Sequence, residues 1–233
     1  MLLEGIPASS GIQIGIALLF LPEELDIQDY EIDESDIEKE LSRFESALAQ
    51  TKKELQEIHE LIESEMTSAY SGIFGAHLIL LEDPMFSGEV RKRIKNFNQN
   101  AAFAVKQVTM SLIERFSSID DEYFKGRDAD IRDVARRLIH NLLGKEKTDL
   151  SNLKKEVIVI AHDLSPSDTA LMDREKVIGF ATDVGSRTSH TAIMARALEI
   201  PAVVGLGKVS TQVKTGDLII VDANRGRVII NPD

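Results

Sequence analysis

The chain has 233 residues, of which 43% are hydrophobic and 28% charged, enough to bury one large core or two smaller ones. Its formal net charge of −12 repels a phosphate backbone, which argues against nucleic acid and leaves a basic protein partner or simple solubility as explanations. The absence of cysteine excludes disulfides and thiolate metal sites and fits a cytoplasmic protein, and no apolar run reaches the roughly 18 residues of a membrane span.

The first 20 residues predict a strand. Ile12, Ile14, Ile16 and Leu18 alternate with other residues in a stretch that also has glycine at positions 5, 11 and 15. Successive side chains of a strand point to opposite faces, so this alternation predicts a strand with one buried face. A segment this short must pair with strands from elsewhere in the chain.

Helical spacing dominates from about residue 33 to residue 144. Ser35 followed by Glu38 is a capping-box pattern for a helix start. A seam of residues follows, defined by alternating spacings of four and three positions, and all but one of its members are apolar. The seam consists of Ile37, Leu41, Phe44, Leu48, Thr51, Leu55, Ile58 and Ile62. Further helices are predicted over residues 68–81, 85–97, 101–116 and 121–143. We expect an antiparallel helical bundle over residues 31–145.

Strands and helices alternate after Glu156. The pattern predicts strands over 157–161, 177–182 and 202–205, short helices over 165–171 and 189–198, and a closing hairpin over 218–221 and 228–230. This alternation is typical of an α/β layer structure, which the first strand is expected to join. The predicted organisation is an α/β domain of residues 1–30 and 146–233 with the bundle inserted into it.

The segment from Gly185 to Gly205 carries the strongest chemical signal. It reads Gly-Ser-Arg-Thr-Ser-His-Thr-Ala-Ile-Met-Ala-Arg-Ala-Leu-Glu-Ile-Pro-Ala-Val-Val-Gly. A strand is expected to end near Val184, a glycine turn follows, and His190 falls in the first turn of a helix. Backbone N–H groups and the helix dipole would favour an anion such as a phosphoryl group there. The plainer interpretation of His190 is a polar residue at a helix start.

Neighbouring side chains could add to such a site. Arg187, Thr188 and Ser189 could donate hydrogen bonds to phosphoryl oxygens. No spacing typical of a metal site occurs among the five histidines, and the chain has no nucleotide-binding glycine loop. Three of the other histidines have simpler structural interpretations: His59, His140 and His162.

The Gly185–Gly205 segment resembles the phosphohistidine signature shared by Enzyme I of the bacterial sugar phosphotransferase system, pyruvate phosphate dikinase and phosphoenolpyruvate synthase. Three further stretches resemble Enzyme I in particular, namely residues 5–11 (Gly-Ile-Pro-Ala-Ser-Ser-Gly), 73–83 and 121–137. Together they extend the resemblance over essentially the whole chain. It implies a swivelling α/β domain with an inserted helical bundle that binds the small phosphocarrier HPr.

The resemblance also implies site residues. The phosphorylated histidine falls on His190, and the hydroxyl that orients its ring falls on Thr169. The HPr-docking surface would draw on one set of bundle residues: His77, Ile79, Leu80, Phe86, Phe116, Phe124 and Arg127. Burial in the bundle explains the apolar members equally well, and Arg127 is alternatively a solvated helix charge or an intra-bundle partner of Asp130. Ser186, where the signature commonly has glycine, and residues 68–70 depart from the family pattern.

The implied activity is transfer of a phosphoryl group from phosphoenolpyruvate to His190 and on to a histidine of HPr, for sugar uptake in the cytoplasm. The phosphoenolpyruvate-binding C-terminal domain and its magnesium are expected beyond Asp233, with no cofactor in this stretch and no dimerisation through it. Two alternatives stay open. One is the swivelling domain of a pyruvate phosphate dikinase or phosphoenolpyruvate synthase, and the other is a non-catalytic helical binding module.

Overall fold

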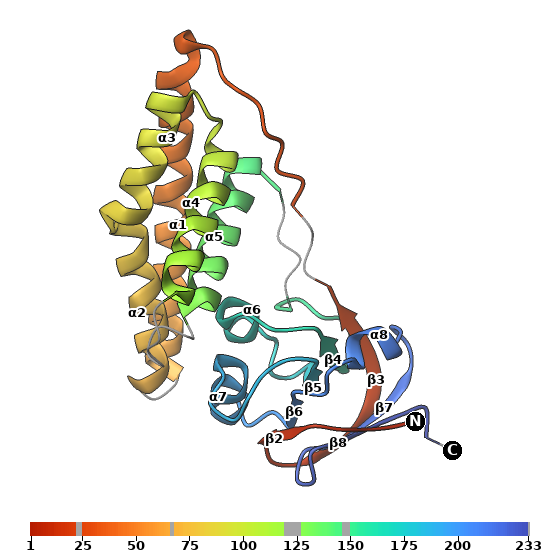
Figure 1. Ribbon diagram of the computed structural model, residues 1–233. Coiled ribbons are helices and arrows are strands. Elements are labelled where there is room, and N and C mark those ends of the chain that lie inside the picture. Colours follow the sequence, from red (N-terminus) through yellow and green to blue (C-terminus); the bar gives the residue numbers. More distant parts are fainter. Residues whose placement is uncertain (22–24, 66–67, 119–126, 146–149, 233) are drawn as a thin grey trace. The chain divides into compact units, whose positions relative to one another are not determined.

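A computed structural model describes residues 1–21, 25–65, 68–118, 127–145 and 150–232. The chain divides into two compact units, one made of residues 1–23 and 148–233 and the other of residues 24–147. The first unit is an α/β structure and the second is helical, as the sequence pattern predicted (Figure 1).

Helices of the second unit pack alongside one another in Figure 1. Helix α1 contacts each of the other four, and α5 also packs on α2 and α4. A short 3₁₀ turn precedes α1, and a π-helical turn lies between α2 and α3. The elements are η1 (Glu34–Asp36), α1 (Ile37–Glu65), α2 (Ser68–Glu82), η2 (Pro84–Gly88), α3 (Glu89–Phe97), α4 (Ala101–Ser117) and α5 (Arg127–Leu143).

The predicted seam of α1 forms part of the core of this unit. Phe44, Leu55 and Ile62 expose 1% of their surface or less. The one polar member, Thr51, is also fully buried. Its hydroxyl donates to the Ala47 carbonyl (2.8 Å) and accepts from the side-chain amide of Asn141 (2.9 Å). Both partners satisfy a group whose burial would otherwise be costly.

An eight-stranded sheet, in the order β1-β8-β7-β3-β4-β5-β6-β2, forms the first unit. Strand β3 pairs parallel with β4 and antiparallel with β7, so it joins a parallel region to an antiparallel one. The strands are β1 (Leu2–Glu4), β2 (Ile6–Ser9), β3 (Ile12–Phe20), β4 (Val157–Ala161), β5 (Val177–Thr182), β6 (Ala202–Val204), β7 (Leu218–Asp222) and β8 (Arg227–Ile230). Three short helices accompany them: α6 (Pro166–Ala170), α7 (His190–Ala197) and α8 (Val209–Gln212).

The isoleucine face of β3 is not the buried one, which corrects the expectation from its alternation. Ile12, Ile14 and Ile16 expose 55%, 59% and 46% of their surface, whereas Ala17 is buried in the core of the unit. The core beneath β3 is filled by side chains from both regions of the sheet, including Ile158, Val203 and Ile219. Gly15 and Ala17 of β3 lie against this core, together with the partly buried Leu19, whereas the three isoleucines are exposed.

Candidate functional site

The turn that leads into α7 is shaped by a glycine and by serine hydroxyls. Gly185 has a φ of +123°, and a Cβ there would lie 2.9 Å from the Cβ of Val204, so both the backbone and the space favour glycine. The Ser186 carbonyl accepts from the N–H (3.2 Å) and the hydroxyl (2.9 Å) of Ser189. The Ser186 and Thr188 hydroxyls lie 3.2 Å apart, so Ser186 contributes its side chain to the turn.

His190 is the first residue of α7. Ser189 caps the helix, with its hydroxyl accepting from the Ala192 N–H (3.3 Å). His190 itself is half-buried, whereas Arg187 and Thr188 are exposed. His190 therefore lies at the N-terminal end of α7, where the helix dipole is positive and the preceding turn is exposed to solvent. This position favours an anionic group.

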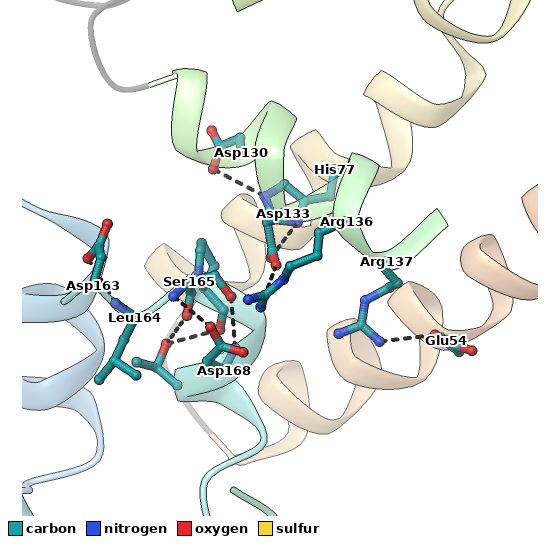
Figure 2. Close-up of polar contacts among 12 residues, drawn as sticks. Glu54, His77, Asp130, Asp133, Arg136, Arg137, Asp163, Leu164, Ser165 and Asp168 are labelled. Carbon is teal, nitrogen blue, oxygen red and sulfur yellow. Dashed lines mark hydrogen bonds and ion pairs between the residues drawn. The ribbon is translucent and has the colours of Figure 1, made fainter. Parts of the chain in front are cut away.

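Thr169 lies in α6, which packs against α7. Ser165 and Asp168 form a reciprocal capping box at the start of α6, shown in Figure 2. Thr169 is fully buried, and its hydroxyl donates to the carbonyls of Ser165 (3.1 Å) and Pro166 (2.9 Å). A hydroxyl has one hydrogen and two acceptor lone pairs, so Thr169 can offer another group only an acceptor.

Two carboxyl groups lie where β4 and β5 end. Burial raises the pKa of Asp163, against the opposing effect of the Leu164 N–H, and the Thr191 hydroxyl lies 3.5 Å from this carboxylate. Burial also acts to raise the pKa of Asp183, but hydrogen bonds from Ser210 and His162 outweigh it and lower the pKa. His162 Nδ1 lies 3.1 Å from Asp183, a contact that the sequence pattern did not predict.

A buried histidine connects two helices of the second unit. His77 of α2 is fully buried, with Nε2 3.1 Å from Asp130 Oδ1 and Nδ1 3.9 Å from Asp133 Oδ2, both on α5 (Figure 2). Phe74 packs edge-on against the imidazole. The Arg127 guanidinium lies 3.5 Å from Asp130, which places Arg127 in the intra-bundle ion pair considered above.

The residues expected to form the docking surface differ widely in exposure. Ile79 is 70% exposed, and Leu80 and Phe116 are partly buried. His77 and Phe86 are 0% exposed, so burial in the bundle, the alternative given above for the apolar members, describes both side chains. Phe124 lies outside the described residues.

Among the residues that the structure describes, no three histidine, aspartate or glutamate side chains are arranged to hold a metal ion. Within the same ranges, none of the helices is long and apolar enough to cross a bilayer.

Comparisons with known proteins match both units. A family profile described as "PEP-utilising enzyme, N-terminal" matches residues 4–127, and one described as "PEP-utilising enzyme, mobile domain" matches residues 153–226. The phosphoenolpyruvate-protein phosphotransferases of Bacillus subtilis and Staphylococcus aureus are 46% and 44% identical to 99% of this chain. The chain spans 40% of the length of each of these relatives.

Solved structures agree with these sequence matches. A solution structure of an Enzyme I protein is 51% identical, with a TM-score of 0.79 over 99% of this chain and 93% of that one. A structure described as the N-terminal domain of a nitrogen Enzyme 1 is 24% identical, with a TM-score of 0.67 over 99% of this chain and 94% of that one. The second likeness shows a shared fold.

Proposed function

We propose, because this chain belongs to the Enzyme I family of phosphoenolpyruvate-protein phosphotransferases, that His190 carries a phosphoryl group and exchanges it with a histidine of HPr. We place this exchange in the cytoplasm, as a step of sugar uptake. The donor named in the relatives is phosphoenolpyruvate. We assign binding of that donor, and of magnesium, to the part of the relatives that this chain does not match.

The single observation that carries the proposal is the placement of His190 in the first turn of α7, beside the Gly185 turn. In the forward direction, the bond between phosphorus and the His190 nitrogen breaks while a bond to a ring nitrogen of HPr forms. The attacking nitrogen must be deprotonated, and the leaving imidazole nitrogen keeps the electron pair of the broken bond. The protein contributes mainly position and charge stabilisation, because this transfer needs little other covalent chemistry.

Electrostatics at α7 suit a group that gains negative charge. The Ser189 hydroxyl already donates to the Ser186 carbonyl. The first-turn N–H groups and the nearby Thr188 hydroxyl are further hydrogen-bond donors, and Arg187 is a cation on the same turn. We infer that they bind the phosphoryl oxygens and hold phosphorus in line with the incoming nitrogen.

Incubation of the chain with HPr that carries a ³²P-labelled phosphohistidine tests this function. We expect the label to appear on the chain, to be lost in acid as a phosphohistidine requires, and to return to unlabelled HPr. A chain that takes up no acid-labile phosphate would be a binding module instead.

Thr169 is proposed to set the tautomer of His190. Its hydroxyl hydrogen is directed to α6 carbonyls, so it would accept a hydrogen bond from the protonated ring nitrogen of His190 and leave the other nitrogen free to attack. Thr169→Val keeps the shape and removes this acceptor. We expect phosphoryl uptake from HPr to slow by about 10- to 100-fold, roughly 1.4 kcal/mol per factor of ten, measured by rapid quench.

Thr109→Val provides the matched control. Thr109 of α4 also donates its hydroxyl to a carbonyl one helical turn earlier, that of Val105 (2.7 Å), but it lies in the helical unit. Its loss should leave uptake unchanged. If Thr169→Val transfers at the wild-type rate, Thr169 has no part in the mechanism.

The helical unit is proposed to supply the HPr-docking surface, through the exposed Ile79 with the partly exposed Leu80 and Phe116. An exposed isoleucine on a helix can insert into an apolar contact with a partner. The net charge of −12 would attract a basic face of the carrier during the encounter.

Ile79→Ala should weaken HPr binding by about 1 to 2 kcal/mol, roughly 5- to 30-fold in Kd, because apolar anchors carry much of an interface's affinity. Isothermal titration with HPr measures the change. Phe97→Ala is the control, since Phe97 is 62% exposed on α3 of the same unit but lies outside the predicted surface. Equal affinities for wild type and Ile79→Ala would move the docking surface elsewhere.

A further inference from the structure

Arg196 joins two distant parts of the α/β unit. It lies in the last turn of α7, where Nη1 donates to the Ala8 carbonyl and Nη2 to the Arg187 carbonyl, each at 3.1 Å. Within the described residues, its hydrogen-bond partners are these two backbone carbonyls, and no carboxylate forms an ion pair with it. The guanidinium group of Arg196 thus binds two backbone carbonyls and does not neutralise a carboxylate.

The Ala8 carbonyl is available because β2 contains a bulge. Pro7 pairs with Val203 and Ser9 pairs with Ala202, so Ala8 is an extra residue with no partner across the strand pair. A bulge interrupts the ladder and redirects the backbone, and here the buried Ala8 directs its carbonyl to Arg196. This gives a physical role to the glycine- and proline-containing motif at residues 5–11, which the proposed transfer chemistry leaves unexplained.

The Arg187 carbonyl belongs to the turn that precedes His190. The other hydrogen bonds of Ser186, Thr188 and Ser189 span four residues or fewer. Arg196 instead connects this turn to Ala8, which lies 188 positions from Arg196 in sequence. The peptide group is planar, so holding the Arg187 carbonyl also fixes the direction of the Thr188 N–H. That N–H donates to the Ser186 hydroxyl (3.3 Å).

We propose that Arg196 is a positioning residue for phosphoryl transfer, which clamps the Ala8 bulge to the Arg187 carbonyl and so fixes the turn that presents His190. This inference rests on the proposed function. The bidentate geometry is essential to it, because the two carbonyls require two N–H donors in a fixed fork. A lysine keeps the charge but offers a single ammonium on a flexible stem.

Arg196→Lys and Arg196→Met test the clamp. We expect both to slow phosphoryl uptake from ³²P-labelled phospho-HPr by about 10- to 100-fold, because small displacements of a reacting group cost factors of this size. The affinity for HPr should not change, since docking is assigned to the helical unit. Addition of guanidinium at millimolar concentration to an Arg196→Ala chain should restore part of the rate.

Arg227→Met is the matched control. Arg227 is an arginine of β8 in the same unit, with its guanidinium 3.1 Å from the Glu4 carboxylate, and its replacement changes the net charge equally. Its uptake rate should equal that of wild type. A fully active Arg196→Lys chain would show that charge alone matters and would overturn the clamp.

An NMR measurement tests the clamp without any transfer. Amide shifts of Thr188 and Ser189, and ¹⁵N shifts of the His190 ring, should move in Arg196→Lys and stay in place in Arg227→Met. Unchanged shifts in Arg196→Lys would overturn the proposal even if transfer were slow. If the wild-type chain accepts no phosphoryl group, the proposed function fails, and the shifts still decide whether Arg196 holds the turn.

Discussion

His190→Ala should abolish acid-labile labelling of the chain by phospho-HPr. Removal of a covalent nucleophile leaves no group to form the intermediate, and losses on the order of 10⁶-fold follow such changes in other enzymes. The measurement is acid-sensitive ³²P incorporation, read on a gel after incubation with labelled phospho-HPr. His190→Gln should behave in the same way while keeping a polar side chain at the start of α7.

His162→Ala is the closest control for this loss. His162 is in the same unit, its side chain is 66% exposed, and its Nδ1 contacts the Asp183 carboxylate. A carboxylate partner of this kind orients an imidazole, so His162 is the strongest competing acceptor in the α/β unit. We expect its replacement to leave labelling intact. Full labelling of His190→Ala, or phosphate mapped to any other histidine, would refute the assignment.

Phe86→Ala should destabilise the helical unit by about 3 to 5 kcal/mol, the usual cost of deleting a buried phenylalanine. Phe86 is 0% exposed in the η2 turn, and the surrounding helices cannot close fully around the cavity that the ring would leave. Urea unfolding followed by circular dichroism at 222 nm measures the effect as a lower midpoint at constant slope.

Ile79→Ala serves as the contrast, because a side chain that is 70% exposed loses little on truncation, within about 0.5 kcal/mol. The two variants should therefore separate stability from docking, with Phe86→Ala lowering the midpoint and Ile79→Ala lowering HPr affinity. An unchanged midpoint for Phe86→Ala, combined with weaker HPr binding, would return Phe86 to the docking surface.

Local patterns predicted most elements of both units, although they did not indicate α8 or the separate strands β1 and β2. The seam of α1 is a property of side chains three and four residues apart, and the capped start of α6 needs only Ser165 and Asp168. The phosphohistidine segment is equally local, since Gly185, the turn and the first residues of α7 lie within a few positions of one another. Interactions of this range act before any tertiary contact forms, so the residues alone indicate them.

Burial was less predictable than secondary structure. The alternation of Ile12, Ile14 and Ile16 indicated a strand, but which face is covered depends on how the two regions of the sheet enclose a core. Hydrophobicity alone did not distinguish the exposed Ile79 from the buried Phe86 in the stretch around Pro84. A residue's depth depends on the elements that pack over it, which come from other parts of the chain.

The sequence by itself determined the class of most elements, the position of His190 at a helix start and the resemblance to Enzyme I. Only the tertiary structure decided that His77 is buried against Asp130, 53 positions away, and that Arg196 reaches the bulge at Ala8. Such contacts depend on which distant backbones come together, and pairing of that kind leaves no periodicity in the sequence. The structure thereby connects the motif at residues 5–11 with the phosphohistidine turn, because the spare carbonyl of a bulge and the fork of an arginine meet there.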